Sequence, residues 1–161
     1  MAAPPPPPPT AGARLSAPKP ASVPAKKTWA ELFPYHCAAQ LGDVAGLTQQ
    51  IDAMPASTRT AQLSARDEDG WTALHYSSWY GHVAAVTLLL AAGADPNAKT
   101  ENGSSVLHFA AGCGRAEIVQ LLLDAGAQHN VTDAEKQTPL QLCNQLKEHE
   151  WARVVDLLQK Q

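Results

Sequence analysis

The sequence has 161 residues, of which 45% are hydrophobic, 17% charged and 6% aromatic, which predicts one small domain with an aliphatic core. Twelve basic and 15 acidic side chains give a formal net charge of −3, and this balance argues against nucleic acid as a ligand. Three cysteines without a CxxC pair argue against a disulfide framework or a zinc knuckle and favour a reducing compartment.

The first segment, residues 1–28, differs from the rest in composition. Nine of the 13 prolines fall within the first 24 residues, and four basic residues but no acidic residue precede Glu31. Such a segment cannot bury much apolar surface, so we predict a disordered proline-rich tail with polyproline II character. It could be a spacer, a ligand for SH3, WW or profilin-type domains, or an organelle transit peptide.

No part of the sequence predicts a membrane segment. The most apolar stretch, Val83 to Ala92, has 10 residues, whereas a spanning helix needs about 20. The N-terminus also lacks the apolar region of a secretory signal. We expect a monomer without membrane contact in the cytoplasm or nucleus, unless the tail is a transit peptide.

An internal period of 33 residues organises the rest of the chain. The segment Asp69 to His75 reads DGWTALH, and the segments 33 and 66 residues later read NGSSVLH and EKQTPLQ. An earlier copy around 34–42 (PYHCAAQLG) is displaced by a six-residue insertion, which we place between Met54 and Ser64. A period of this length is typical of a solenoid in which each unit stacks on its neighbours.

Each unit predicts two short helices and a turn. In the second unit, Thr72 is a hydroxyl N-cap for a first helix that Gly81 ends. A second helix runs from about Val83 to Ala91 and is closed by Gly93, and the DEDG segment at 67–70 provides the turn of a connecting hairpin. Small residues that let neighbouring first helices approach closely occur as three pairs, Ala38-Ala39, Ser77-Ser78 and Ala110-Ala111.

These residues resemble an ankyrin repeat. The family pattern T-P-L-H-x-A-A-x-x-G-H…G-A-D…N-A is nearly complete in residues 67–99, with a close copy at 100–132 and degenerate copies at about 32–64 and 133–161. The sequence departs from the pattern where Ala73 and Val106 replace proline. The resemblance implies an all-α ankyrin repeat solenoid, made of helix–turn–helix pairs with β-turn fingers, at 29–161 after the disordered tail at 1–28.

The histidines are typical of a structural role. His36, His75 and His108 recur once per unit, whereas a catalytic site would occur once. In ankyrin-like proteins this histidine bridges loops by hydrogen bonds. His129 and His149 have no Cys or His partner at zinc spacing. We therefore expect no catalytic, cofactor-binding or metal-binding residues, and no enzyme activity.

Three other groups of residues also have structural interpretations. Cys37 and Cys143 fall at apolar or small positions of first helices, so we expect buried thiols. Asn97 and Asn130 match the loop asparagine that an oxygenase hydroxylates in some ankyrin-like proteins, but we favour a turn-stabilising role. Trp151 has core spacing in the last helix.

The variable positions of the repeat predict a protein-binding site. In proteins similar to this one, partners bind the hairpin fingers and first helices on the concave face. These positions hold Glu68, Asp69, Trp71, Trp79, Tyr80, Glu101, Asn102 and Cys113. Trp and Tyr are common interface anchors, although Trp71 and Trp79 could instead pack on neighbouring repeats.

Acidic side chains surround these candidate anchors in the sequence. The expected turns carry six carboxylates: Asp67, Glu68, Asp69, Glu101, Asp133 and Glu135. They could simply be solvated, or they could steer a basic peptide or helix towards the aromatic residues.

The sequence thus predicts a non-enzymatic adaptor or regulator that binds a basic partner protein through its concave face and acidic fingers. One alternative is a chaperone that masks a very basic client such as a ribosomal protein, and its binding should weaken steeply with salt. Another is a targeting or inhibitory subunit, which should alter the activity of an enzyme that it captures.

Overall fold

The computed structural model describes residues 34–146 and 152–160. The predicted disorder of the tail and the predicted core position of Trp151 lie outside these residues. Within them the regular elements are helices, and one isolated antiparallel bridge joins Lys99 and Ser105.

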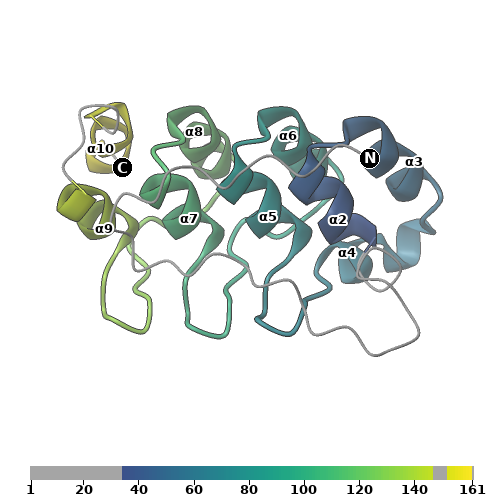
Figure 1. Ribbon diagram of the computed structural model, residues 1–161, viewed down its shortest axis with the longest axis horizontal. Coiled ribbons are helices and arrows are strands. Elements are labelled where there is room, and N and C mark those ends of the chain that lie inside the picture. Colours follow the sequence, from purple (N-terminus) through teal and green to yellow (C-terminus); the bar gives the residue numbers. More distant parts are fainter. Residues whose placement is uncertain (1–33, 147–151, 161) are drawn as a thin grey trace.

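The described residues form helix pairs that stack in a row (Figure 1). The first helices of the pairs are α2 (Pro34–Leu41), α5 (Ala73–Tyr80), α7 (Val106–Gly112) and α9 (Pro139–Leu146). The second helices are α3 (Val44–Asp52), α6 (Val83–Ala91), α8 (Ala116–Asp124) and α10 (Ala152–Gln159). Each set forms one layer, and neighbouring pairs contact each other. This arrangement confirms the predicted all-α fold of paired helices.

Three loops project from the same side of the first-helix layer (Figure 1). We call their turns finger 1 (67–70), finger 2 (100–103) and finger 3 (133–136). The backbone N–H of Glu101 donates to the carbonyl of Asp69 at 3.4 Å, and that of Ala134 donates to the carbonyl of Asn102 at 2.9 Å. These hydrogen bonds join neighbouring fingers into a continuous edge.

Finger 3 departs from the backbone pattern of the other fingers. The last residue of each turn has a positive φ: 79° at Gly70, 72° at Gly103 and 61° at Lys136. Glycine adopts this left-handed region without penalty because it has no Cβ, whereas lysine does not. Lys136 is therefore a strained position in an otherwise repeated turn.

The predicted insertion folds as an additional helix, α4 (Ala56–Leu63). The helix begins after Pro55 and buries Leu63. The hydroxyl of Tyr35 on α2 donates to the side-chain oxygen of Gln62 at 3.4 Å. Figure 1 shows α4 on the side of the molecule from which the fingers project. The first helix pair is thus followed by a helix before finger 1.

The core lies between the two helix layers and is mainly aliphatic. Leu47, Leu89 and Leu122 of the second helices are completely buried, and all three predicted pairs of small residues are buried as well. Cys143 is buried as expected, but Cys37 is only half-buried, so this part of the prediction is wrong. Among the described helices, α2 has a neighbouring first helix on one side only, which leaves Cys37 less covered.

Candidate protein-binding surface

The recurring histidines cap the first helices. The backbone N–H of Thr72 donates to Nδ1 of His75, and that of Ser105 donates to Nδ1 of His108, both at 3.1 Å. In the fourth unit Gln141 replaces the histidine, and its Oε1 accepts from the N–H of Thr138 at 2.9 Å. These bonds satisfy donors at helix starts that would otherwise lack partners.

Two of the three recurring histidines, His36 and His108, also reach the next unit. Nε2 of His36 lies 3.0 Å from the carbonyl oxygen of Trp71, and Nε2 of His108 lies 2.9 Å from that of Gln137. Burial lowers the pKa of all three histidines, that of His75 to about 3, although backbone carbonyls including that of Ser104 partly oppose the shift. His36 and His108 are therefore neutral loop bridges, as the resemblance implied, whereas Nε2 of His75 is buried without a hydrogen-bond partner among the described residues.

Trp71 and Trp79 form part of an aromatic cluster inside the molecule. Trp71 is 4% exposed and Trp79 is 2% exposed. Their ring centroids lie 4.4 Å and 5.9 Å, respectively, from that of Phe109 on α7. The prediction that both tryptophans are exposed interface anchors is therefore wrong as to their placement. They fill the space between the second and third units instead.

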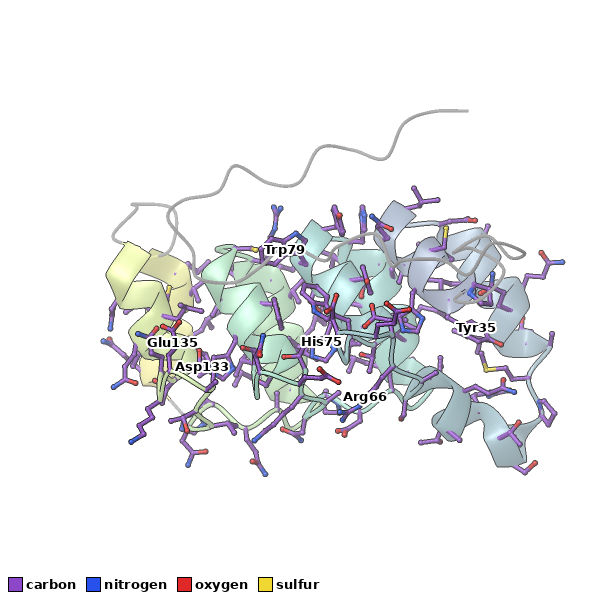
Figure 2. All side chains as sticks on the ribbon, turned by 60° about the horizontal axis from the view of Figure 1, so that its bottom comes forward. Tyr35, Arg66, His75, Trp79, Asp133 and Glu135 are labelled. Carbon is purple, nitrogen blue, oxygen red and sulfur yellow. The ribbon has the colours of Figure 1, made fainter. Side chains whose placement is uncertain are left out.

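The aromatic and acidic parts of the predicted site also lie apart. Trp79 is in the last turn of α5, whereas the fingers precede the first turns of the helices. Figure 2 shows Trp79 at the end of the helix layer away from Asp133 and Glu135 of finger 3. The predicted single patch is thus split into a helix-end region and a finger region.

Tyr80 and Cys113 are the partly exposed candidates of the helix-end region. The hydroxyl of Tyr80 accepts a hydrogen bond from Nε2 of Gln40 at 3.1 Å, and its ring stacks on His82 with centroids 6.2 Å apart. Burial raises the pKa of the Cys113 thiol to about 11, against a smaller lowering by Arg115. Cys113 is therefore protonated at neutral pH, and it is a poor nucleophile.

Two of the six predicted carboxylates hold the fingers in shape. Oδ1 of Asp67 accepts from the backbone N–H groups of Asp69 and Trp71, at 3.0 Å and 2.8 Å, and Oδ2 accepts from the hydroxyl of Tyr76 at 2.5 Å. In finger 3, Oδ1 of Asp133 likewise accepts from the backbone N–H groups of Glu135 and Gln137, both at 2.9 Å. Both residues are partly buried. Their role is to fix the turn, and a ligand would have to compete with these bonds.

The other predicted finger residues are exposed. We call them the finger edge: Glu68, Asp69, Glu101, Asn102 and Glu135. Our sequence reasoning missed three basic residues in the same loops: Arg66, Lys99 and Lys136. Arg66 and Lys99 directly precede the turn residues in the sequence, and this position could have indicated that they belong to the same surface. The edge is thus acidic but contains positive charge as well.

Asn97 has the turn-stabilising role that we favoured. Its Nδ2 donates to the carbonyl of Gly126 at 3.2 Å, and its Oδ1 accepts from the N–H of Gln128 at 2.8 Å. The side chain therefore joins the loops that follow α6 and α8.

The described parts of the chain contain neither a metal-binding cluster nor a membrane-spanning helix. No group of three His, Cys, Asp or Glu side chains there could hold a metal ion. None of the helices described there combines the length and apolar character that crossing a membrane requires.

Comparison with known protein families agrees with this architecture. A model for "Ankyrin repeats (3 copies)" matches residues 21–100, and one for "Ankyrin repeats (many copies)" matches residues 80–123. The chain belongs to the ankyrin repeat family. Ankyrin repeats are units of protein–protein interaction, so this is a protein-binding helical repeat protein.

Individual relatives match shorter segments. "Calmodulin-binding transcription activator 6" from Arabidopsis thaliana is 54% identical over 35 residues, which is 22% of this chain and 4% of that protein. The human "NAD-capped RNA hydrolase NUDT12" is 39% identical over 61 residues, which is 38% of this chain and 12% of that protein. The chain thus spans only a small part of these relatives.

Proposed function

We propose that this ankyrin repeat protein is a non-enzymatic adaptor or regulator that binds a basic segment of a partner protein along the finger edge. One observation carries the proposal. Glu68 and Asp69 of finger 1 and Glu101 of finger 2 are exposed on turns whose backbones are hydrogen-bonded to each other. The backbone positions that carry these carboxylates are therefore held at a fixed spacing before any partner arrives.

Such an arrangement favours selective binding over tight binding. A single exposed ion pair contributes only about 0.2–1 kcal/mol, so several pairs must form together. Pre-ordered charges steer the encounter and reject partners of the wrong charge. Arg66 and Lys99 in the same loops would repel a ligand whose basic residues are out of register.

The repeated histidines and Cys113 support a non-enzymatic role. The three repeated histidines are buried, and two of them lie within 3.0 Å of carbonyls of the next unit. The pKa of the Cys113 thiol is raised to about 11 by burial. Neither group has the exposure and basicity that a nucleophile or a general base needs.

The mixed charge of the finger loops favours an adaptor over a chaperone for a very basic client. Masking such a client calls for dense negative charge, whereas Arg66 and Lys136 lie next to the finger carboxylates Asp67 and Glu135 in the sequence. A targeting or inhibitory subunit would be recognised by its partner. The captured protein would be an enzyme, and its activity would change on binding.

Charge reversal on the finger edge tests the proposal. The variant Glu68→Lys/Asp69→Lys/Glu101→Lys should lose its partner in quantitative affinity purification, and the affinity for that purified partner should fall at least about tenfold. The matched control is Asp52→Lys/Glu117→Lys/Asp124→Lys, which makes the same charge change at three exposed carboxylates of α3 and α8. Equal loss of the partner in both variants would reject the finger edge as the binding surface.

A further inference from the structure

One face of α5 carries three buried polar groups without partners. His75, Ser78 and Trp79 stand at positions i, i+3 and i+4, so they share a face of the helix. This face meets α7, because the ring centroids of His75 and Trp79 lie 5.5 Å and 5.9 Å from that of Phe109. Nε2 of His75, Oγ of Ser78 and Nε1 of Trp79 are buried, and none has a hydrogen-bond partner among the described residues. Such groups are rare in folded proteins.

We call the interface of 73–91 with 106–124, that is of α5 and α6 with α7 and α8, the central joint. It lacks the histidine bridge of the joints on either side, where Nε2 of His36 and Nε2 of His108 each lie within 3.0 Å of a carbonyl oxygen of the next unit. Burial lowers the pKa of His75 and the nearby carbonyl of Ser104 partly opposes the shift, yet Nε2 of His75 has no hydrogen-bond partner among the described residues. The bridge is thus missing only at the central joint.

The other two positions of this face also differ between the units. Ser78 stands where the first helices of the neighbouring pairs have alanine, which has no hydroxyl to satisfy. Trp79 stands where α7 has glycine and where α2 has Gln40. Nε2 of Gln40 donates to the hydroxyl of Tyr80 at 3.1 Å across the first joint. The equivalent faces of α2 and α7 therefore avoid the unpaired groups that α5 carries.

The finger bond across the central joint is long as well. The N–H of Glu101 donates to the carbonyl of Asp69 at 3.4 Å, outside the usual range of about 2.7–3.2 Å, whereas the bond between fingers 2 and 3 measures 2.9 Å. Attraction between α5 and α7 therefore comes mainly from the aromatic cluster around Phe109. Apolar contact is non-directional, so it resists a tilt of the helices less than hydrogen bonds do.

The second-helix side of the central joint is fastened by hydrogen bonds. Nδ2 of Asn97 donates to the carbonyl of Gly126 at 3.2 Å, and Oδ1 of Asn97 accepts from the N–H of Gln128 at 2.8 Å. These bonds join the loops that follow α6 and α8. The joint is thus held by directional bonds on one side and by apolar contact on the other.

We propose that the central joint is a hinge whose pivot is Asn97. Tilting about the pivot moves α7 away from α5 and finger 2 away from finger 1, and it lets water reach the three unpaired groups of α5. The closed form described above is the resting state, because opening exposes the rings of Trp71 and Trp79 to water. A segment bound across fingers 1 and 2 would hold the hinge closed, and this consequence rests on the proposed function.

Amide hydrogen exchange of the full chain, followed by NMR without a partner, tests the hinge. The amides of Glu101 and Ala134 are matched reporters, because both residues are exposed and each donates to the preceding finger. After correction for intrinsic rates, Glu101 should exchange at least about tenfold faster than Ala134. Equal protection of the two amides would overturn the proposal.

Two serine variants distinguish a hinge from a hydrogen bond that is merely long. Ser78→Ala removes an unpaired hydroxyl from the closed form, so exchange at Glu101 should become at least about threefold slower while exchange at Ala134 stays unchanged. The matched control is Ser77→Ala, since Ser77 is equally buried but its hydroxyl donates to the carbonyl of Leu74 at 3.2 Å. Unchanged exchange in Ser78→Ala, or equal slowing in both variants, would overturn the hinge.

A pair of asparagine variants tests the pivot. Asn97→Ala should accelerate exchange at Glu101 at least about threefold, whereas Asn130→Ala, at the equivalent exposed position after α8, should leave it unchanged. Equal exchange at Glu101 in Asn97→Ala and in the wild type would overturn the assignment of the pivot. All these measurements are made without a partner, so failure of the hinge is distinguishable from failure of the proposed function.

Discussion

Lys136 occupies a backbone position that suits glycine better. The equivalent residues of fingers 1 and 2 are Gly70 and Gly103, and all three have a positive φ. The left-handed conformation costs a residue with a Cβ about 1–2 kcal/mol, part of which is offset because glycine makes the unfolded chain more flexible. Lys136→Gly should therefore raise the free energy of unfolding by up to about 1 kcal/mol in urea denaturation. Lys136→Ala, which keeps a Cβ, should give no comparable gain, and equal gains would show that backbone strain is not the cause.

Trp79 stabilises the fold in this structure. Its side chain is 2% exposed and packs on Phe109, so Trp79→Ala should lower the free energy of unfolding by about 3–5 kcal/mol, as for other large core residues. Tyr80→Ala, at the adjacent and partly exposed position, should cost markedly less. Chemical denaturation of both variants measures the difference. Similar small losses in both would contradict the core assignment of Trp79.

The misplacement of the two tryptophans has an identifiable physical origin. The sequence shows that positions 71 and 79 vary between units, and variable positions of a repeat are usually on the surface. Burial at these positions depends on the side chains that the next unit presents, and here Phe109 covers both rings. A period aligns equivalent positions, but it does not show which side chains from different units meet across an interface.

The buried capping histidine His75 makes the stability of the fold depend on pH. Burial holds the pKa of His75 at about 3 in the folded state, against about 6.5 in the unfolded chain. Between these values only the unfolded chain binds the proton, so the free energy of unfolding should fall as pH falls below about 6.5. Near pH 5 this one residue contributes a slope of about 1.4 kcal/mol per pH unit.

His75→Gln removes this titration with little change in shape. Gln141 already occupies the equivalent position in the fourth unit and accepts the capping bond there. Urea denaturation from pH 7.5 to 4.5 should show a shallower loss of stability in the variant than in the wild type, with the curves parallel above pH 7. Curves that are parallel throughout would mean that His75 is not buried in the neutral form.

The helix pairs were predictable from the period, whereas α4 was not. Thr72, Gly81 and Gly93 mark element ends by local rules of capping that act within a few residues, and α5 and α6 begin and end as these rules predict. The insertion between Met54 and Ser64 has no counterpart in the other units, so alignment placed it without indicating its structure. The roles of the finger carboxylates were not predictable either. Asp67 and Glu68 are neighbouring acidic residues in the sequence, and only the hydrogen bonds of the structure show that Asp67 fixes the turn.

Stability of the whole molecule should follow its linear order. Each described helix pair contacts its neighbours along the row, and in such solenoids a defect is felt mainly next to its own unit. Leu142→Ala removes a buried side chain of α9 and should accelerate amide hydrogen exchange in α9 and α10 while leaving α2 and α3 unchanged. Leu107→Ala in the central α7 should accelerate exchange on both sides. Uniform acceleration by Leu142→Ala would indicate a single cooperative unit.

The hydrogen-bonded fingers also define a rule for the sequences that can lie along them. Adjacent helix pairs pack about 8–10 Å apart, so the fingers repeat at a similar interval. A peptide in the polyproline II conformation advances about 3.1 Å per residue with three residues per turn. Lysines or arginines at every third position would therefore lie on one side of such a peptide and meet successive fingers, whereas the same residues at every second position would point to different sides. A finger edge that binds a basic segment, as we propose, would thus select for the interval between positive charges as well as for their number.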